Sequence, residues 1–121
     1  MTYLLAEGLS RLLVGGYPLV SPWVGILGAF ATGSNNNSNV LFGSLQKNAA
    51  VLLGLNPDLL VAAQTAGGSL GSMLAPAKII VGCSTVNQGG QEGRVLRQTV
   101  PLGLAIGLAV GLLTFILSRL R

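Results

Sequence analysis

The chain has 121 residues, of which half are hydrophobic and only 8% are charged, and its formal net charge is +4. Soluble domains carry about 25% charged residues, so seven basic and three acidic side chains are too few to cover a compact soluble fold. With 18 glycines and a mean hydropathy of +0.69, the composition indicates an integral membrane protein.

The residue inventory also excludes several classes of function. Histidine is absent, which removes histidine acid–base relays, Ser–His–Asp triads and histidine zinc sites. Cys83 is the single cysteine, so the chain has no internal disulfide and no cysteine metal cluster. The basic residues are scattered between apolar stretches and form no basic face. We therefore expect no nucleic-acid partner, no metal, no cofactor and no enzymatic activity.

Three long windows carry no charged residue, at residues 12–46, 59–77 and 98–118. The last window is about 31 Å long as a helix, which matches a hydrocarbon core of about 30 Å. The expected fold class is an all-α membrane protein, with transmembrane helices, a re-entrant hairpin and a second broken helix. We expect it to pass through the cell membrane several times, in contact with the lipid bilayer.

The first expected element is the end of an N-terminal helix within residues 1–16. Leucines recur there at helical spacing, and Glu7 and Arg11 lie four residues apart, so that they can pair on one helix face. These charges interrupt the apolar stretch, and the segment lacks the basic start of a signal peptide. Two consecutive glycines then end the helical pattern.

Residues 17–55 are expected to form a re-entrant helical hairpin. A short apolar arm precedes a polar tip at residues 32–39, which has no apolar side chain, and an apolar pattern then returns. Each arm is too short to cross a bilayer. Non-helical backbone at membrane depth is tolerated where it lines a cavity or is buried in protein. We therefore expect residues 34–39 to be a non-helical connection between two short helices.

Residues 56–86 are expected to form a discontinuous helix. Asn56, Pro57 and Asp58 make a strong helix start, as N-cap, first-turn proline and acid at the positive end of the helix dipole. Capping is the first interpretation of Asp58, and proton carrying is the alternative. Three closely spaced glycines and a later proline predict a break near residues 66–76.

The last third of the chain is expected to hold an aqueous loop at residues 87–98, a transmembrane helix at residues 99–118 and a basic tail at residues 119–121 that anchors the helix at the headgroups. Three glycines repeat at four-residue intervals along this helix and share one face, which favours close helix packing. They are Gly103, Gly107 and Gly111. An alternative interpretation is a small membrane-embedded interaction protein that oligomerises through these glycines without transport.

The two polar interruptions are the candidate substrate-binding region. Free N–H groups at a half-helix N-terminus bind carboxylates, and broken helices form the substrate sites of secondary transporters. Lys78, beside the second interruption, is either a counter-charge for an anionic substrate or a lysine that snorkels to the membrane interface. If both interruptions serve one substrate, we expect them to approach each other across the fold. The candidate binding residues are Ser34, Asn35, Asn36, Asn37, Ser38, Asn39, Thr65, Ser69, Ser72 and Lys78.

The same regions resemble a known family. Two long motifs closely resemble signatures of the L-lactate permease family, at residues 28–46 (GAFATGSNNNSNVLFGSLQ) and at residues 62–83 (AAQTAGGSLGSMLAPAKIIVGC). A loop at residues 93–97 and one terminal helix follow in the order of that family. The resemblance runs from about Pro18 to the C-terminus.

This resemblance implies a secondary transporter that carries lactate, and often glycolate, into the cell together with protons. It also implies inverted repeats and re-entrant hairpins. Asn36 stands where threonine is expected in many members, which leaves the substrate preference open. The chain resembles only the C-terminal portion of longer members. The implied partners are lactate or a related 2-hydroxy monocarboxylate, protons as coupling ion, and the missing N-terminal part of the transporter.

Overall fold

The computed structural model describes residues 1–13 and 15–120. Within these residues the chain forms six α-helices and no strand. The helices are α1 (Thr2–Leu12), α2 (Tyr17–Thr32), α3 (Asn35–Leu53), α4 (Pro57–Leu74), α5 (Pro76–Thr85) and α6 (Glu92–Arg119). The all-helical part of the expected fold class is therefore confirmed.

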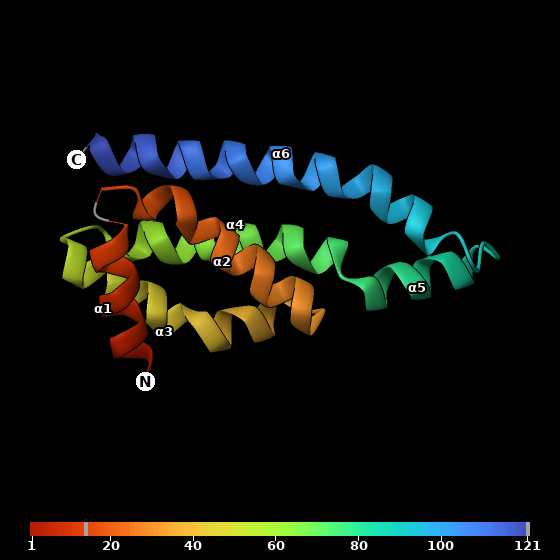
Figure 1. Cartoon of the computed structure of the whole chain (residues 1–121), viewed down its shortest axis with the longest axis horizontal. Helices are drawn as coiled ribbons and strands as arrows, with labels where there is room; N and C mark the ends of the chain where they lie inside the picture. Colours follow the sequence, from red (N-terminus) through yellow and green to blue (C-terminus); the bar gives the residue numbers. More distant parts are fainter. Residues whose placement is uncertain (14, 121) are drawn as a thin grey trace.

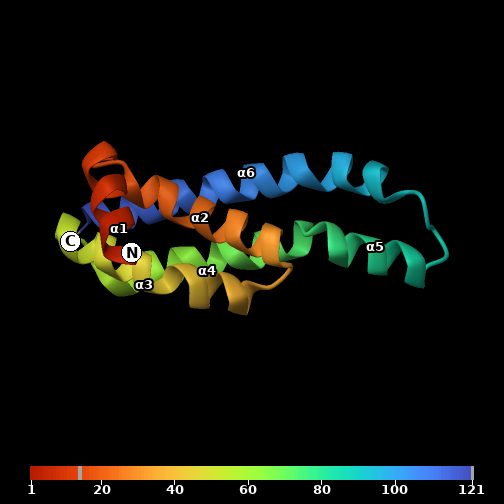
Figure 2. The same cartoon turned by 60° about the horizontal axis from the view of Figure 1, so that its bottom comes forward.

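The helices form an elongated bundle around α2 and α4 (Figure 1). α2 packs against α3, α4 and α6, while α1 lies across one end of the bundle and packs on α3. α5 and the loop to α6 extend from the other end (Figure 2). The turn between α2 and α3 lies beside the end of α4, part of the way along α6. Both helix breaks therefore lie within the length of the bundle.

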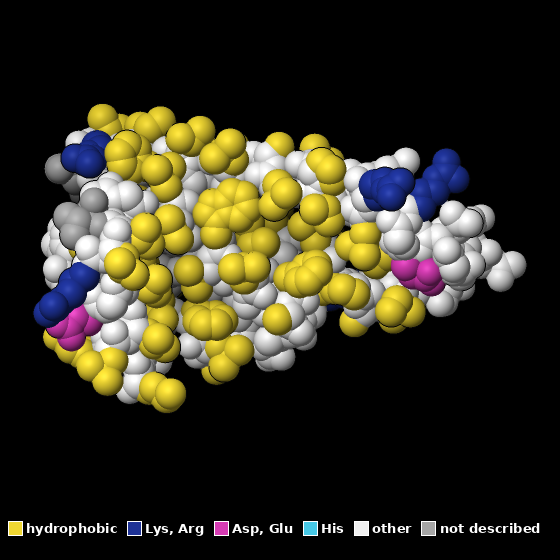
Figure 3. All heavy atoms as spheres, viewed as in Figure 1, with side chains coloured by type: hydrophobic (Ala, Val, Ile, Leu, Met, Phe, Trp, Pro, Cys, Tyr) yellow, Lys and Arg dark blue, Asp and Glu magenta, His cyan; other side chains and the backbone are white. Residues whose placement is uncertain are grey.

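One helix, α6, is long and apolar enough to cross a membrane, by length and composition. α4 and α5 pass the same test when they are taken together across a bend of 47°. α2 is apolar but has 16 residues, which is about 24 Å of helix. Hydrophobic side chains cover much of one face of the bundle, and charged side chains lie toward its two ends (Figure 3). This distribution fits a protein with lipid around its middle.

The connection between α2 and α3 is shorter than the sequence pattern predicted. The expected non-helical segment, residues 34–39, is helical from Asn35 onward, so its extent was wrong. Gly33 ends α2 in the left-handed region, with φ of 70°. The Ser34 hydroxyl oxygen then accepts the N–H of Asn37 at 3.3 Å, as an N-cap does. A serine cap thus starts the next helix inside the polar run.

The second break lies at one residue within the predicted interval, residues 66–76. α4 continues as a helix through the glycine run, so the interpretation of these glycines as the break was wrong. The break is Ala75, which is extended, with φ of −60° and ψ of 129°. Pro76 follows in the first turn of α5, where a missing N–H group costs no helical hydrogen bond.

The glycines of α4 are instead its contact surface with α2. A Cβ atom added to Gly67 would overlap the carbonyl oxygen of Pro22, and one added to Gly71 would overlap that of Ile26. Small residues at helix interfaces allow backbones to approach closely. The glycine run therefore brings the α2 backbone directly against α4, with no side chains between them at these positions.

The glycine stripe of α6 packs inside the chain in a similar way. Gly103 faces the side chain of Leu74 from α4, and Gly107 faces the side chain of Trp23 from α2. Its expected packing role is confirmed. In the described chain, α2 and α4 already cover this glycine stripe. The stripe is therefore not exposed for contact with a second copy, as the oligomer alternative requires.

α6 is longer than the expected span of residues 99–118. It begins at Glu92, inside the segment expected to be an aqueous loop, so residues 92–98 are helical. Arg119 belongs to its last turn rather than to a separate tail. Arg121, the other basic residue of that tail, lies outside the described residues.

Two local predictions at helix ends are confirmed. Arg11 donates to the Glu7 carboxylate at 2.7 Å on the surface of α1. At the start of α4, the side-chain oxygen of Asn56 accepts the N–H of Asp58 at 2.8 Å. Val14, which the expected first helix included, lies outside the described residues.

Candidate functional site

The two helix breaks meet in a group of polar residues that we call the break cluster. Its members are Gly33, Ser34, Asn35, Ser69, Ser72 and Lys78. Asn35 Nδ2 donates to Ser69 Oγ at 3.0 Å, which joins the start of α3 to α4. Ser72 Oγ donates to the carbonyl oxygen of Gly33 at 3.4 Å, which joins the other side of the same turn to α4. These contacts place the two breaks side by side, through Asn35 and Gly33 rather than through Asn37, which is exposed.

Local geometry fixes the side chain of Asn35 against α4. Ser69 donates its own hydroxyl proton to the carbonyl oxygen of Thr65 at 3.1 Å, so its oxygen is free to accept from Asn35. A Cβ atom on Gly68 would overlap Asn35 Oδ1, so this glycine makes the room that the amide occupies. Asn35 Oδ1 is buried and has no hydrogen-bond partner among the described residues. One acceptor of the break cluster is therefore left unmatched.

Lys78 brings a positive charge to the same place. It lies in the first turn of α5, and its ammonium group donates to Ser72 Oγ. Through Ser72 it is connected to Gly33, at the C-terminal end of α2, where the helix dipole favours a cation. An ammonium group has further N–H donors beyond this one bond. Lys78 therefore lies at the breaks and has N–H donors that are not used by its bond to Ser72.

Backbone N–H groups add neutral donors to this charge. Within the described residues, the N–H groups of Asn35 and Asn36 at the start of α3 have no acceptor. The N–H group of Ala77, at the start of α5, has none either. Helix N-termini of this kind bind carboxylates and other anions. The break cluster thus combines one cation, free backbone donors and serine hydroxyls.

A second polar group, which we call the amide network, lies deeper between α2, α3 and α4. Its members are Tyr17, Ser21, Ser38, Gln46 and Gln64, and all of them are fully buried. The hydroxyls of Tyr17 and Ser21 each donate to Gln46 Oε1 at 3.0 Å. Gln46 Nε2 donates to Gln64 Oε1 at 2.9 Å, and Gln64 Nε2 donates to Ser38 Oγ at 3.0 Å. The amide network therefore ties three helices together through complete hydrogen bonds.

Sequence reasoning did not single out the two glutamines of this network. Gln46 ends one charge-free window, and Gln64 lies inside the next. An uncharged amide in an apolar helix is a signal for a buried partner, since an unpaired buried amide is costly. The pattern could have marked both residues, although their pairing depends on how the helices pack.

The remaining predicted site residues take different positions. Ser38 belongs to the amide network and donates to the carbonyl oxygen of Gly25 at 3.0 Å. The Thr65 hydroxyl bonds to its own helix one turn earlier, at 3.0 Å. Asn36 and Asn37 are exposed, and Asn39 has a buried Oδ1 without a partner among the described residues. Beyond the break cluster, these residues do not form one site.

Asp58 lies far from the break cluster, at the opposite end of α4. It is exposed in the first turn of α4, about 24 Å by helix length from the other end of that helix. This position suits the interaction with the positive end of the helix dipole that its sequence context indicates.

Comparison with known proteins finds relatives that are all named as lactate or glycolate permeases. The chain is 41% identical over 100 residues to the glycolate permease GlcA of Escherichia coli (strain K12), a match that covers 83% of this chain and 18% of that protein. It is 40% identical over 110 residues to the L-lactate permease of Bacillus subtilis (strain 168), covering 90% of this chain and 20% of that protein. It is 42% identical over 98 residues to the L-lactate permease of Salmonella typhi, a match that covers 81% of this chain and 18% of that protein.

The chain spans about a fifth of the length of these relatives. No solved structure matches it. The sequence pattern described as L-lactate permease matches residues 1–121, and permeases are membrane transporters rather than enzymes. This match and the identities above show that the chain belongs to the L-lactate permease family.

Proposed function

We propose that the chain forms the C-terminal part of a larger secondary transporter, which carries lactate or glycolate across the cell membrane together with protons. Membership of the L-lactate permease family and relatives named for lactate and glycolate support this substrate class. The relatives are about five times longer, so the remaining helices of such a carrier correspond to their additional length.

In this proposal the break cluster supplies part of the substrate site. The observation that carries it is the joining of both helix breaks by two bridges, Asn35 to Ser69 and Lys78 through Ser72 to Gly33. A carboxylate that leaves water needs a compensating charge or several hydrogen bonds, or it becomes protonated. Lys78 supplies the charge, and the free N–H groups at the starts of α3 and α5 supply the hydrogen bonds.

The neutral donors also suit release of the substrate. A transported ion must be held strongly enough to enter a site and weakly enough to leave it. One ammonium group with free backbone N–H donors meets this requirement better than a row of arginines.

The proposed membrane arrangement follows from the helix lengths. α6 crosses the bilayer once, α4 and α5 form a broken span, and the α2–α3 pair is a re-entrant hairpin whose turn lies at membrane depth. The chain then passes the membrane more than once, as expected from its family.

A complete transporter that carries this segment, reconstituted in proteoliposomes, tests the proposal. Lys78→Gln should raise the half-saturation concentration for labelled lactate about 5- to 150-fold, which corresponds to the roughly 1–3 kcal/mol of a charge-assisted hydrogen bond. Lys47→Gln is the matched control, because Lys47 is exposed on α3 and lies outside the break cluster. An unchanged half-saturation concentration in Lys78→Gln at every pH would reject the counter-charge role.

The same vesicles test the coupling ion. An inward pH gradient, acid outside, should accelerate lactate uptake when no sodium is present, because the proton and the lactate ion enter together. A sodium gradient without a pH gradient should leave uptake at its basal rate. Failure of the unaltered transporter to accumulate lactate under either gradient would overturn the proposed function itself.

A further inference from the structure

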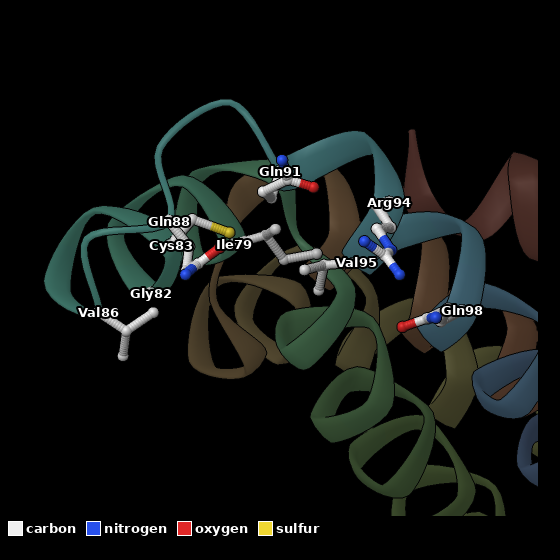
Figure 4. A pocket seen from close by; sticks show the side chains of 9 residues that line it. All are labelled: Ile79, Gly82, Cys83, Val86, Gln88, Gln91, Arg94, Val95 and Gln98. Carbon is white, nitrogen blue, oxygen red and sulfur yellow. The ribbon is translucent and has the colours of Figure 1, made fainter.

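α5 and the first turns of α6 enclose an open pocket of about 440 Å³ (Figure 4). Ile79, Cys83 and Val95 form an apolar floor, and the first two are buried. Ile79 follows Lys78 directly in α5, so the pocket and the break cluster use neighbouring residues of the same helix, although Lys78 itself does not line the pocket. The pocket lies between the site proposed above and the α5–α6 loop.

Polar side chains surround this floor. Gln91, Arg94 and Gln98 line the pocket from α6 and the residue before it. None of these side chains has a hydrogen-bond or ion-pair partner within the part of the chain that the structure describes. Glu92, the nearest acid in sequence, forms no ion pair with Arg94 among the described residues, and its carboxylate accepts the N–H of Gly90 at 3.1 Å. Gln88 also lines the pocket, from the α5–α6 loop, so the lining presents one unpaired guanidinium group and three unpaired amides among the described residues.

We propose that this pocket is a second carboxylate site, which takes up a short monocarboxylate from water before it moves to the break cluster. Arg94 holds the carboxylate through its planar pair of N–H donors, a geometry that suits a carboxylate better than an ammonium does. The Gln98 amide, one turn of α6 after Arg94, binds the hydroxyl group, and the apolar floor receives the methyl group. This inference rests on the proposed function, because it deepens the substrate path of the same carrier.

Charge and shape together select this ligand class. The rim carries a single cation, which balances the single charge of a monocarboxylate and only half of the charge of a dianion. An inorganic anion would leave the floor formed by Ile79, Cys83 and Val95 without an apolar partner. The pocket is open and larger than lactate, so we expect weak, partly hydrated binding that favours passage over retention.

A titration of the whole 121-residue chain in detergent micelles tests the proposal. With arginine side chains labelled with ¹⁵N, sodium lactate should shift the Arg94 Nε–Hε signal in a saturable way. Lactamide, which has a similar shape and no charge, should cause no saturable shift. Arg94→Gln should weaken lactate binding at least about tenfold, as measured by protection of Cys83 from alkylation. Arg97→Gln, on the same helix but outside the pocket lining, should leave binding unchanged.

Cys83 supplies this second measurement, because it is the single cysteine and lies in the pocket floor. Lactate should slow its alkylation by N-ethylmaleimide, and lactamide should not. Equal protection in the unaltered chain and in Arg94→Gln would overturn the proposal, and so would an Arg94 signal that shifts without saturation.

These outcomes are separable from those of the proposed function. Lys78→Gln should leave the Arg94 signal and the protection of Cys83 intact. Lactate transport that depends on Lys78, with no lactate effect on Arg94 or Cys83, would reject the pocket and retain the break cluster. Saturable binding at Arg94 in a carrier that transports no lactate would retain the pocket and reject the proposed function.

Discussion

The amide network and the break cluster both join α2, α3 and α4 through uncharged polar residues, and the break cluster adds Lys78 from α5, yet the two groups differ in completeness. In the amide network every member is fully buried and hydrogen-bonded. The break cluster is partly exposed and keeps an unmatched Asn35 Oδ1, free helix N–H groups and an exposed lysine. The difference teaches that completed hydrogen bonds hold helices together, whereas the uncompleted ones are the donors that the proposed carrier would offer to its substrate.

The two groups are nevertheless connected. Ser38 lies three residues after Asn35 on α3, and its hydroxyl is held by Gln64 and by the backbone of α2. A buried polar group without a partner costs about 1–3 kcal/mol, so the completed network resists movement of this first turn. The rigid amide network therefore holds the start of α3, from which the break cluster projects.

The substitution with the largest expected effect disrupts the amide network and the break cluster together. Gly71→Ala places a methyl group where the backbone carbonyl of Ile26 lies, so α2 must move away from α4. We expect a loss of about 3 kcal/mol in the free energy of unfolding. The measurement is titration with dodecyl sulfate in mixed micelles, followed by fluorescence of Trp23, the single tryptophan.

Gly43→Ala is the control for this substitution. Gly43 is within α3, and a Cβ atom there would meet no atom within 4 Å. We expect no loss of stability and a gain of up to about 1 kcal/mol, because alanine has the higher helix propensity. Similar losses for both variants would contradict the role of close α2–α4 contact.

The substitution with the next largest expected effect disrupts the amide network alone. Gln64→Leu removes the acceptor of Gln46 Nε2 and the donor to Ser38 Oγ, and should lower the free energy of unfolding by about 2 kcal/mol. Asn48→Leu, on α3 and outside the network, should change it far less in the same titration. In the complete transporter, the protein that remains folded should keep its half-saturation concentration for lactate within about twofold. A network that belonged to the binding site would instead show a large rise in that concentration.

The smallest effect concerns the break cluster alone. Ser34→Ala removes the N-cap of α3 and should cost about 1 kcal/mol of stability, measured by the same fluorescence titration. Ser44→Ala, an exposed serine later in α3, should have almost no effect. If the two substitutions cost the same, the Ser34 cap does not hold the turn between α2 and α3.

Much of this arrangement could be predicted from sequence. The uncharged windows predicted helices in lipid, and the two polar interruptions with Lys78 predicted the meeting of two breaks. The exact boundaries of the helices and the contacts between them were harder to predict from sequence. The preference of serine for N-caps could have placed the start of α3 at Asn35, but the role of Gly67 and Gly71 depends on α2, which packs against them from about 45 residues earlier in the chain. The pairing of Gln46 with Gln64 likewise requires the tertiary fold.

The short length of α2 has an electrical consequence. The helix reaches about 24 Å from its start to the turn that carries the break cluster, while a hydrocarbon core is about 30 Å thick. In the proposed re-entrant arrangement, an ion at Lys78 is much nearer to one face of the bilayer than to the other. The transmembrane voltage is worth about 2.3 kcal/mol per unit charge at 100 mV. Most of this voltage then drops between Lys78 and the farther face of the bilayer. Entry from that side is the voltage-sensitive step, and exchange with the nearer face proceeds almost independently of the membrane potential.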